Sequence, residues 1–223
     1  MKTIETTLKT TALYNNDHTK KYLLTKEWDN TKPSLTMVLL APSVSSGIEI
    51  DTTTQRVLGN ADRLGFGSVN IVNLFATMGD PTFSTAEEED KENMKTILDM
   101  AKNCDTLVYA PGNGKAKNEK FQMRSAKVLN ALKPYEKKMK CLSNEDDSVR
   151  LCHPLFPAVR EWYLRDTTVA EAMQAIVEAQ VPPKPVDPRR PSSEEKLLTS
   201  RCVGWGALFR GIIEKGGVCM ILA

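Results

Sequence analysis

The stretch LTMVLLAPSVSSG, residues 35–47, decides the fold of this chain. It is an apolar run that stops at Pro42 and continues into small hydroxyl residues and a glycine. A continuous apolar run of this length is typical of a strand covered on both faces, the usual situation in a parallel sheet. Because ligands of open α/β sheets bind beyond the carboxyl ends of the strands, we expect the functional site to begin between Ala41 and Gly47.

The same succession of apolar strand, polar loop and amphipathic helix recurs along the chain. Further strands are expected over residues 68–75, 105–110 and 138–143. Helices are expected after Asp51, after Ser84, over residues 121–132 and over residues 167–181. This alternation predicts an α/β fold: a three-layer, doubly wound, mainly parallel sheet with helices on both faces.

The two ends of the chain depart from this alternation. Residues 10–14 and 21–28 flank a polar turn and predict a hairpin at the edge of the sheet. We expect the α/β domain to span residues 1–163. Residues 164–223 are expected to form a helical extension that contains a proline-rich linker at 182–191 and offers a surface for a protein partner.

Composition narrows the classes of function. The 30 basic and 28 acidic residues nearly cancel, which argues against a dedicated nucleic-acid clamp. The five cysteines form no C-x-x-C pair and indicate reduced thiols in a cytoplasm. The two histidines lie far apart, so neither a metal nor another cofactor is expected. No apolar run is long enough for a signal peptide or a membrane span, and we expect a soluble cytoplasmic protein without a membrane partner.

Three loops follow the expected parallel strands and should converge on one pocket. Such a pocket would place a few polar groups on a mostly apolar floor, as small-molecule sites do. The polar side chains that these loops offer are Ser43, Ser45, Ser46, Asn73, Asp80 and Asn113. The turn at Gly112 and Asn113 lacks the spacing of a phosphate-binding loop, and an ordinary strand-to-helix turn explains it equally well.

His153 is the most informative titratable residue. It precedes Pro154 and therefore lies in extended backbone, so its side chain projects from a loop. An imidazole there can act as a general acid or as a donor to developing negative charge, and a structural histidine under the loop is the alternative. Asp51 and Asp80 are candidate acids or bases, although Asp51 also suits the N-cap of the following helix.

Two arginines lie on the expected helices next to these loops. Arg56 comes one turn after Asp51, and it can bind an anion or pair with that carboxylate. Arg124 follows the glycine turn and allows the same two interpretations.

The ordered set of these features resembles a bacterial and phage family catalogued as domain of unknown function 1643. The resemblance covers about residues 22–162. It is carried by Trp28, Ala41-Pro42-Ser43, Asp51-Thr52-Thr53, Arg56, Gly65-Phe66-Gly67, Asn73-Leu74-Phe75-Ala76, Asp80-Pro81, Glu92-Asn93, Gly112-Asn113 and His153-Pro154-Leu155. The family usually has Asn-Pro-Ser where this chain has Ala41-Pro42-Ser43, so the amide of that loop is missing here.

More distantly, the layout is similar to the uracil-DNA glycosylase superfamily, in which a Pro-containing loop after a strand and a late His-Pro loop complete the pocket. This resemblance implies recognition of a nucleobase, nucleotide or DNA base and hydrolysis of the N-glycosidic bond. His153 would then stabilise negative charge, and Asp51 or Asp80 would position water. Substrate-binding roles would fall to Pro42, Ser43, Asn73, Phe75, Gly112, Asn113, Arg56 and Arg124.

Two functions of different classes follow. The first is a glycosylase-like enzyme, which the presence of His153, Asp51, Asp80 and Asn113 favours. The second is a non-catalytic binder of a nucleotide or modified base with a protein-interacting tail, which Ala41 favours.

Overall fold

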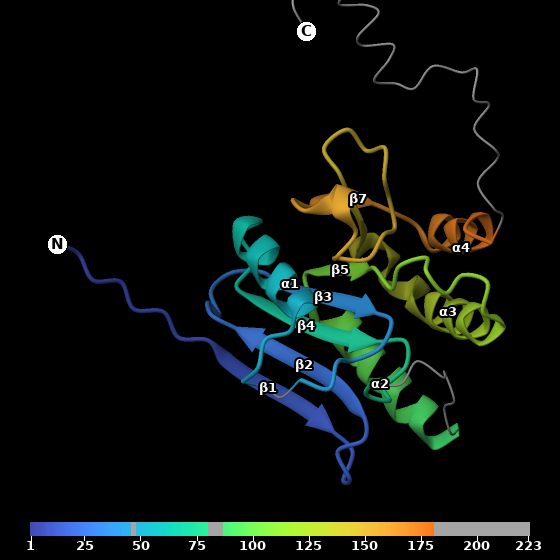
Figure 1. The fold of residues 1–223 in the computed structure, drawn as a ribbon, viewed down its shortest axis with the longest axis horizontal. Helices are drawn as coiled ribbons and strands as arrows, with labels where there is room; N and C mark the ends of the chain where they lie inside the picture. The colour runs from blue at the N-terminus through green and yellow to red at the C-terminus, as the bar shows by residue number, and fades with distance from the viewer. Residues whose placement is uncertain (46–47, 80–86, 181–223) are drawn as a thin grey trace, which may run out of the picture. The chain divides into compact units, whose positions relative to one another are not determined.

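A seven-stranded mixed sheet forms the centre of the computed structural model, which describes residues 1–45, 48–79 and 87–180 (Figure 1). The strands are β1 (Lys9–Tyr14), β2 (Lys21–Glu27), β3 (Ser34–Leu39), β4 (Ser68–Asn73), β5 (Thr106–Tyr109), β6 (Met139–Ser143) and β7 (Tyr163–Asp166). The helices are α1 (Thr52–Arg63), α2 (Glu87–Asn103), α3 (Glu119–Leu132) and α4 (Val169–Glu178), with short 3-10 segments at Lys133–Lys138 and Pro157–Val159.

The strand order is β1-β2-β4-β3-β5-β6-β7. The four central strands, β4, β3, β5 and β6, are parallel to one another, whereas the β1–β2, β2–β4 and β6–β7 pairs are antiparallel. The α/β class and the N-terminal edge hairpin are therefore as predicted. The mainly parallel, doubly wound sheet is not confirmed, because the hairpin and β7 extend the parallel centre with antiparallel strands.

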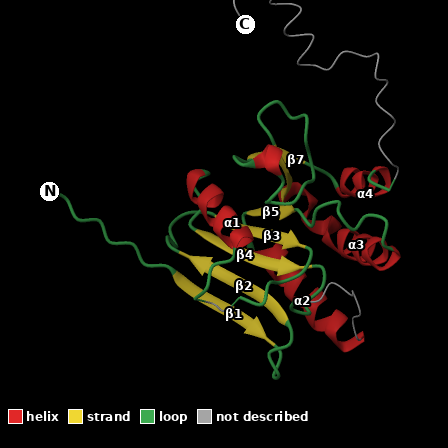
Figure 2. Ribbon diagram, viewed as in Figure 1, coloured by secondary structure: helices red, strands yellow, loops and turns green. Residues whose placement is uncertain are grey.

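Strand β3 is buried on both faces, as its apolar run predicts. Leu35, Met37 and Leu39 pack on the face covered by α1, whereas Val38 packs on the opposite face. Residues of α2, α3 and α4 fill the core on that opposite face. Figures 1 and 2 show α1 on one side of the sheet and α2 and α3 on the other, so the sheet lies between two helical layers.

Helix α1 begins where the sequence predicts. The side chain of Asp51 accepts a hydrogen bond from the main chain of Thr54 and caps the first turn. The helix ends before Gly65, whose φ of 84° lies in the left-handed region that glycine adopts without strain.

The C-terminal part of the described chain packs with the same compact unit as the sheet. Strand β7 pairs with β6, and α4 contacts α3. Helix α4 begins with a capping box in which Thr168 and Glu171 bond each other's main chain. The expected domain boundary after residue 163 thus falls at the start of β7, and the expected linker at 182–191 lies outside the described residues.

Asn60 on α1 joins this helix to the segment before β7. Its side chain accepts a hydrogen bond from the main chain of Trp162 at 3.0 Å and donates one to the carbonyl of Arg160 at 3.1 Å. We expect Asn60→Ala to lower the free energy of unfolding by about 1–3 kcal/mol, because two buried main-chain groups lose their partner. Urea denaturation measures this. Gln55→Ala, on the exposed side of the same helix, is the control, and equal losses in both variants would contradict the prediction.

Candidate functional site

A cavity of about 170 Å³ lies at the carboxyl ends of β3 and β4. The chain leaves β3 toward α1 on one face of the sheet and leaves the neighbouring β5 toward α3 on the other face. Such a point is where ligands bind in open α/β sheets. The lining residues are Lys21, Leu24, Leu39, Ala41, Pro42, Ser43, Asp51, Thr53, Thr54, Ile71, Asn73 and His153.

Asp51 is the centre of the polar wall of this cavity. Its Oδ2 accepts hydrogen bonds from the hydroxyls of Ser43 at 2.8 Å, Ser45 at 3.2 Å and Thr54 at 2.8 Å. Its Oδ1 accepts the main-chain N–H of Thr54 at 2.9 Å. Burial raises the pKa of this carboxyl, but the four hydrogen bonds outweigh it and leave the pKa below its usual value. Asp51 is therefore a weak base that holds the loop after β3 on the start of α1.

Lys21, at the start of β2, lies beneath the same loop. Only 3% of its surface is exposed, and its Nζ donates to the carbonyls of Ser43 at 3.0 Å and Ser45 at 2.8 Å. Burial lowers the pKa of Lys21, and the negative charge of Asp51 partly offsets this effect. The sequence carries no local signal for this role of Lys21, because only the antiparallel β2–β4 pairing brings the start of β2 to the carboxyl end of β4.

Asn73 closes the cavity at the end of β4. Its surface is 3% exposed, and its Oδ1 is buried without a hydrogen-bond partner among the described residues. The main chain around it is fixed, because Asn93 on α2 donates to the carbonyls of Asn73 and Leu74 at 3.0 and 3.1 Å. An unpaired buried acceptor costs free energy, so this amide is suited to a ligand that donates to it.

His153 forms the wall opposite the loop after β3. Its Nδ1 accepts the main-chain N–H of Leu155 at 3.2 Å, which places the proton of the neutral ring on Nε2. Burial lowers the pKa of His153, so the ring is uncharged at neutral pH. Gly112 packs against it: a Cβ at this glycine would lie 2.9 Å from the His153 Cβ. The glycine turn therefore shapes the site by its close approach to His153.

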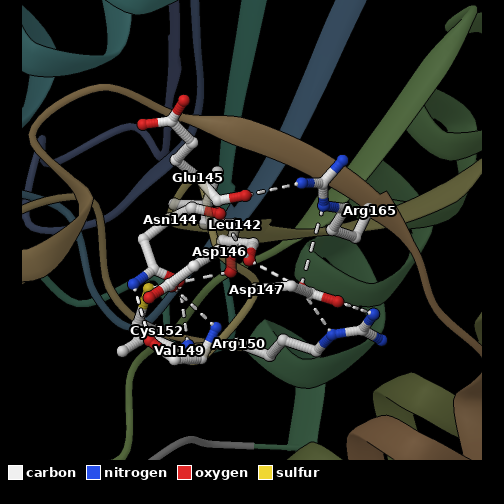
Figure 3. A network of polar contacts seen from close by, with 11 residues as sticks. Leu142, Asn144, Glu145, Asp146, Asp147, Val149, Arg150, Cys152 and Arg165 are labelled. Carbon is white, nitrogen blue, oxygen red and sulfur yellow. Dashed lines mark hydrogen bonds and ion pairs between the residues drawn. The ribbon is translucent and has the colours of Figure 1, made fainter. Parts of the chain in front are cut away.

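A polar network folds the loop that carries His153 (Figure 3). Asp147 accepts the hydroxyl of Ser143 at 2.7 Å and pairs with Arg150 and Arg165. Bonding to Arg150 first, and then to Ser143, lowers the pKa of Asp147 to about 2. In the same turn, the Asn144 side chain accepts the main-chain N–H of Val149 at 3.0 Å. These contacts fix the chain between β6 and His153.

The structure brings together five of the site residues expected from the sequence: His153, Asp51, Pro42, Ser43 and Asn73. Gly112 touches this set through His153.

The other expected residues lie elsewhere. Phe75 is part of the core on the α2 and α3 face, and the buried Arg124 donates through Nε to the carbonyl of Leu74 at 2.7 Å. Asn113 lines a separate groove beside α4, and Arg56 lines a shallow groove on α1. Asp80 lies outside the described residues.

The part of the chain that the structure describes contains neither a metal-binding cluster of side chains nor a membrane-spanning helix. No three His, Cys, Asp or Glu side chains gather there in a group that could hold a metal ion. Within residues 1–45, 48–79 and 87–180, no helix combines the length and the apolarity that a membrane span requires.

Comparison with known proteins gives one match. A family model described as "Protein of unknown function (DUF1643)" matches residues 21–155, more than half of the 223 residues. No curated protein and no solved structure matches the chain. The matched span begins at Lys21 and ends two residues after His153, so it contains every residue that lines the cavity.

The network in Figure 3 predicts a pH dependence of stability. Because the folded pKa of Asp147 is lowered from 3.8 to about 2, its contribution is complete above pH 3.8 and is lost as the pH falls toward 2. Asp147→Asn should therefore reduce the free energy of unfolding at pH 6, and the difference from the wild type should shrink by pH 2. Urea denaturation at a series of pH values measures it. Glu145→Gln, in the same turn, should leave the wild-type profile unchanged, and a profile for Asp147→Asn that parallels the wild type would refute the assignment.

Proposed function

The chain belongs to the DUF1643 family of proteins of unknown function, and we propose that it recognises a nucleobase with a single six-membered ring in the cavity at the ends of β3 and β4. The observation that carries this proposal is that Asn73 lines that cavity and has a side-chain Oδ1 that is buried without a hydrogen-bond partner among the described residues. A ligand N–H would satisfy this acceptor and remove its cost.

The size of the cavity supports a single ring. A protein cavity of about 150 Å³ accommodates benzene. The cavity here measures about 170 Å³, which matches one pyrimidine ring and is small for a fused purine. Leu24, Leu39 and Ile71 supply apolar surface for the ring.

The polar groups of the cavity support a nucleobase over a purely apolar ring. A side-chain amide such as that of Asn73 pairs with a base edge that carries a donor beside an acceptor. The neutral His153 offers an N–H at Nε2 for an exocyclic oxygen. The distant resemblance to the uracil-DNA glycosylase superfamily, carried by Ala41-Pro42-Ser43 and His153-Pro154-Leu155, agrees with this chemistry.

Hydrolysis of the N-glycosidic bond is the second candidate function, and His153 favours it. When that bond breaks, the departing base gains negative charge, which a fixed N–H donor stabilises. The attacking water needs a separate base, and Asp51 is a poor one because four hydrogen bonds already occupy it and lower its pKa. We therefore assign Asp51 the role of holding the loop. Base recognition is the first candidate function and hydrolysis the second.

Binding of free bases tests the recognition step. Isothermal titration with uracil, thymine, cytosine and adenine should give binding of at least one pyrimidine and none of adenine. Asn73→Ala should weaken that binding about tenfold or more, as expected for the loss of a buried hydrogen bond worth about 1.4 kcal/mol. Asn130→Ala, on the exposed side of α3, is the matched control. Equal affinity of the Asn73→Ala and wild-type proteins for the bound pyrimidine would refute the proposal.

The second candidate has its own assay. DNA oligonucleotides, nucleosides and nucleotides that carry uracil or hydroxymethylpyrimidines are incubated with the protein, and released base is measured. Release that His153→Ala abolishes would establish the hydrolase. Binding of a base without release from any of these substrates would assign the protein to the non-catalytic class.

A further inference from the structure

Lys21 is a buried cation in the cavity for which the proposed function has no role. It is one of two lysines on β2 that are almost completely buried, the other being Lys26, which is 2% exposed. Lys26 donates to the hydroxyl of Thr10 on the neighbouring strand and does not line the cavity. The ammonium of Lys21 instead donates to two main-chain carbonyls of the loop after β3, and it also lies 5.6 Å from the centroid of the Tyr14 ring. Lys21 therefore binds the loop after β3, whereas Lys26 binds the neighbouring strand β1.

The contacts of Lys21 connect two loops of the site. Its main-chain N–H donates to the carbonyl of Ala76 at 2.9 Å, in the segment after β4. Its ammonium donates to the carbonyls of Ser43 and Ser45, in the loop after β3. One residue thus ties the chain beyond β3 and the chain beyond β4 to the start of β2.

We propose that Lys21 is a positioning residue of the base site, which fixes the Ser43–Ser45 segment through two carbonyls and offers its third N–H to an acceptor oxygen of the ligand. The proposal rests on the proposed function for its second half. An ammonium carries three donors, and two of them are used by Ser43 and Ser45. Because Lys21 lines the cavity, the third donor and the positive charge favour an electron-rich atom such as an exocyclic carbonyl oxygen of a base.

The free-energy cost of burying the Lys21 ammonium distinguishes a positioning role from a contribution to the stability of the fold. Burying an ammonium costs free energy, and the carbonyls of Ser43 and Ser45 compensate it only in part, as the lowered pKa of Lys21 shows. Asp51, whose negative charge raises the pKa of Lys21, itself accepts four hydrogen bonds from Ser43, Ser45 and Thr54. A methionine of similar shape would avoid this cost, so we expect Lys21→Met to fold while losing the constraint on the loop.

The test compares Lys21→Met and Lys21→Arg with Lys26→Met, a control on the same strand with the same degree of burial. NMR order parameters of the Val44 and Ser45 amides report the loop, with rigid backbone near about 0.85 and flexible backbone below about 0.6. We expect rigid values in the wild type and in Lys26→Met, flexible values in Lys21→Met and partial retention in Lys21→Arg. The affinity for free uracil or thymine should fall about tenfold in Lys21→Met and stay unchanged in Lys26→Met.

The two readouts separate the two proposals. If the wild type binds no base, the proposed function fails, and the order parameters still decide whether Lys21 positions the loop. Rigid Val44 and Ser45 amides in Lys21→Met would overturn the positioning role. A flexible loop with unchanged affinity in Lys21→Met, or an equal loss of affinity in Lys26→Met, would overturn the contribution to binding.

Discussion

The site depends on the hydrogen bonds that the Asp51 carboxylate accepts, because this one side chain both caps α1 and holds the loop after β3. Its hydrogen bond to the main chain of Thr54 starts α1, and its bonds to Ser43 and Ser45 hold the loop after β3 against that helix start. From the other side, Lys21 holds the same two serines by their carbonyls. The loop is thus fixed through both its side chains and its main chain. Lys21 is buried and Asp51 is partly buried, and their hydrogen bonds compensate part of the free-energy cost of removing the two charges from water.

Local patterns in the sequence were sufficient for the elements that build this site. The apolar run at 35–40 and the Asp51 cap are short-range signals, and each corresponds to the element predicted from it. Lys21 gave no such signal, because its place in the site depends on pairing between β2 and β4, which are far apart in the chain. The mixed character of the sheet was missed for the same reason. Strand direction relative to a distant neighbour is a tertiary property, and Tyr163–Asp166 is too short to display a period of its own.

Judged from residue type, the sequence predicts more polar and aromatic side chains in the pocket than the structure places there. Phe75 and Arg124 both lie near the end of β4, yet they face the α2 and α3 side of the sheet, where Phe75 packs in the core and Arg124 supports the carbonyl of Leu74. Alternation along a strand would put Phe75 on the same face as Asn73, but Phe75 lies beyond the last residue of β4, where Leu74 and Phe75 both pack in the core on the α2 and α3 side. The sequence correctly predicts that a residue lies at the carboxyl ends of the strands. The face on which it emerges depends on the register and on the local path of the loop.

The charge states in the cavity favour recognition over proton transfer. The pKa of Asp51 is lowered, and its carboxylate already accepts four hydrogen bonds. His153 is neutral, and its Nδ1 accepts the main-chain N–H of Leu155. Neither Asp51, with its lowered pKa, nor His153, with its Nδ1 bonded to the main chain, is well suited to act as a general base. The cavity instead offers the N–H at His153 Nε2 and the ammonium of Lys21 as donors, and Asn73, whose Oδ1 is buried without a partner among the described residues, also lines it. Because the free protein bears the cost of that unpaired atom, a ligand that pairs with it recovers free energy on binding, and selectivity for the donor pattern follows from the same atom.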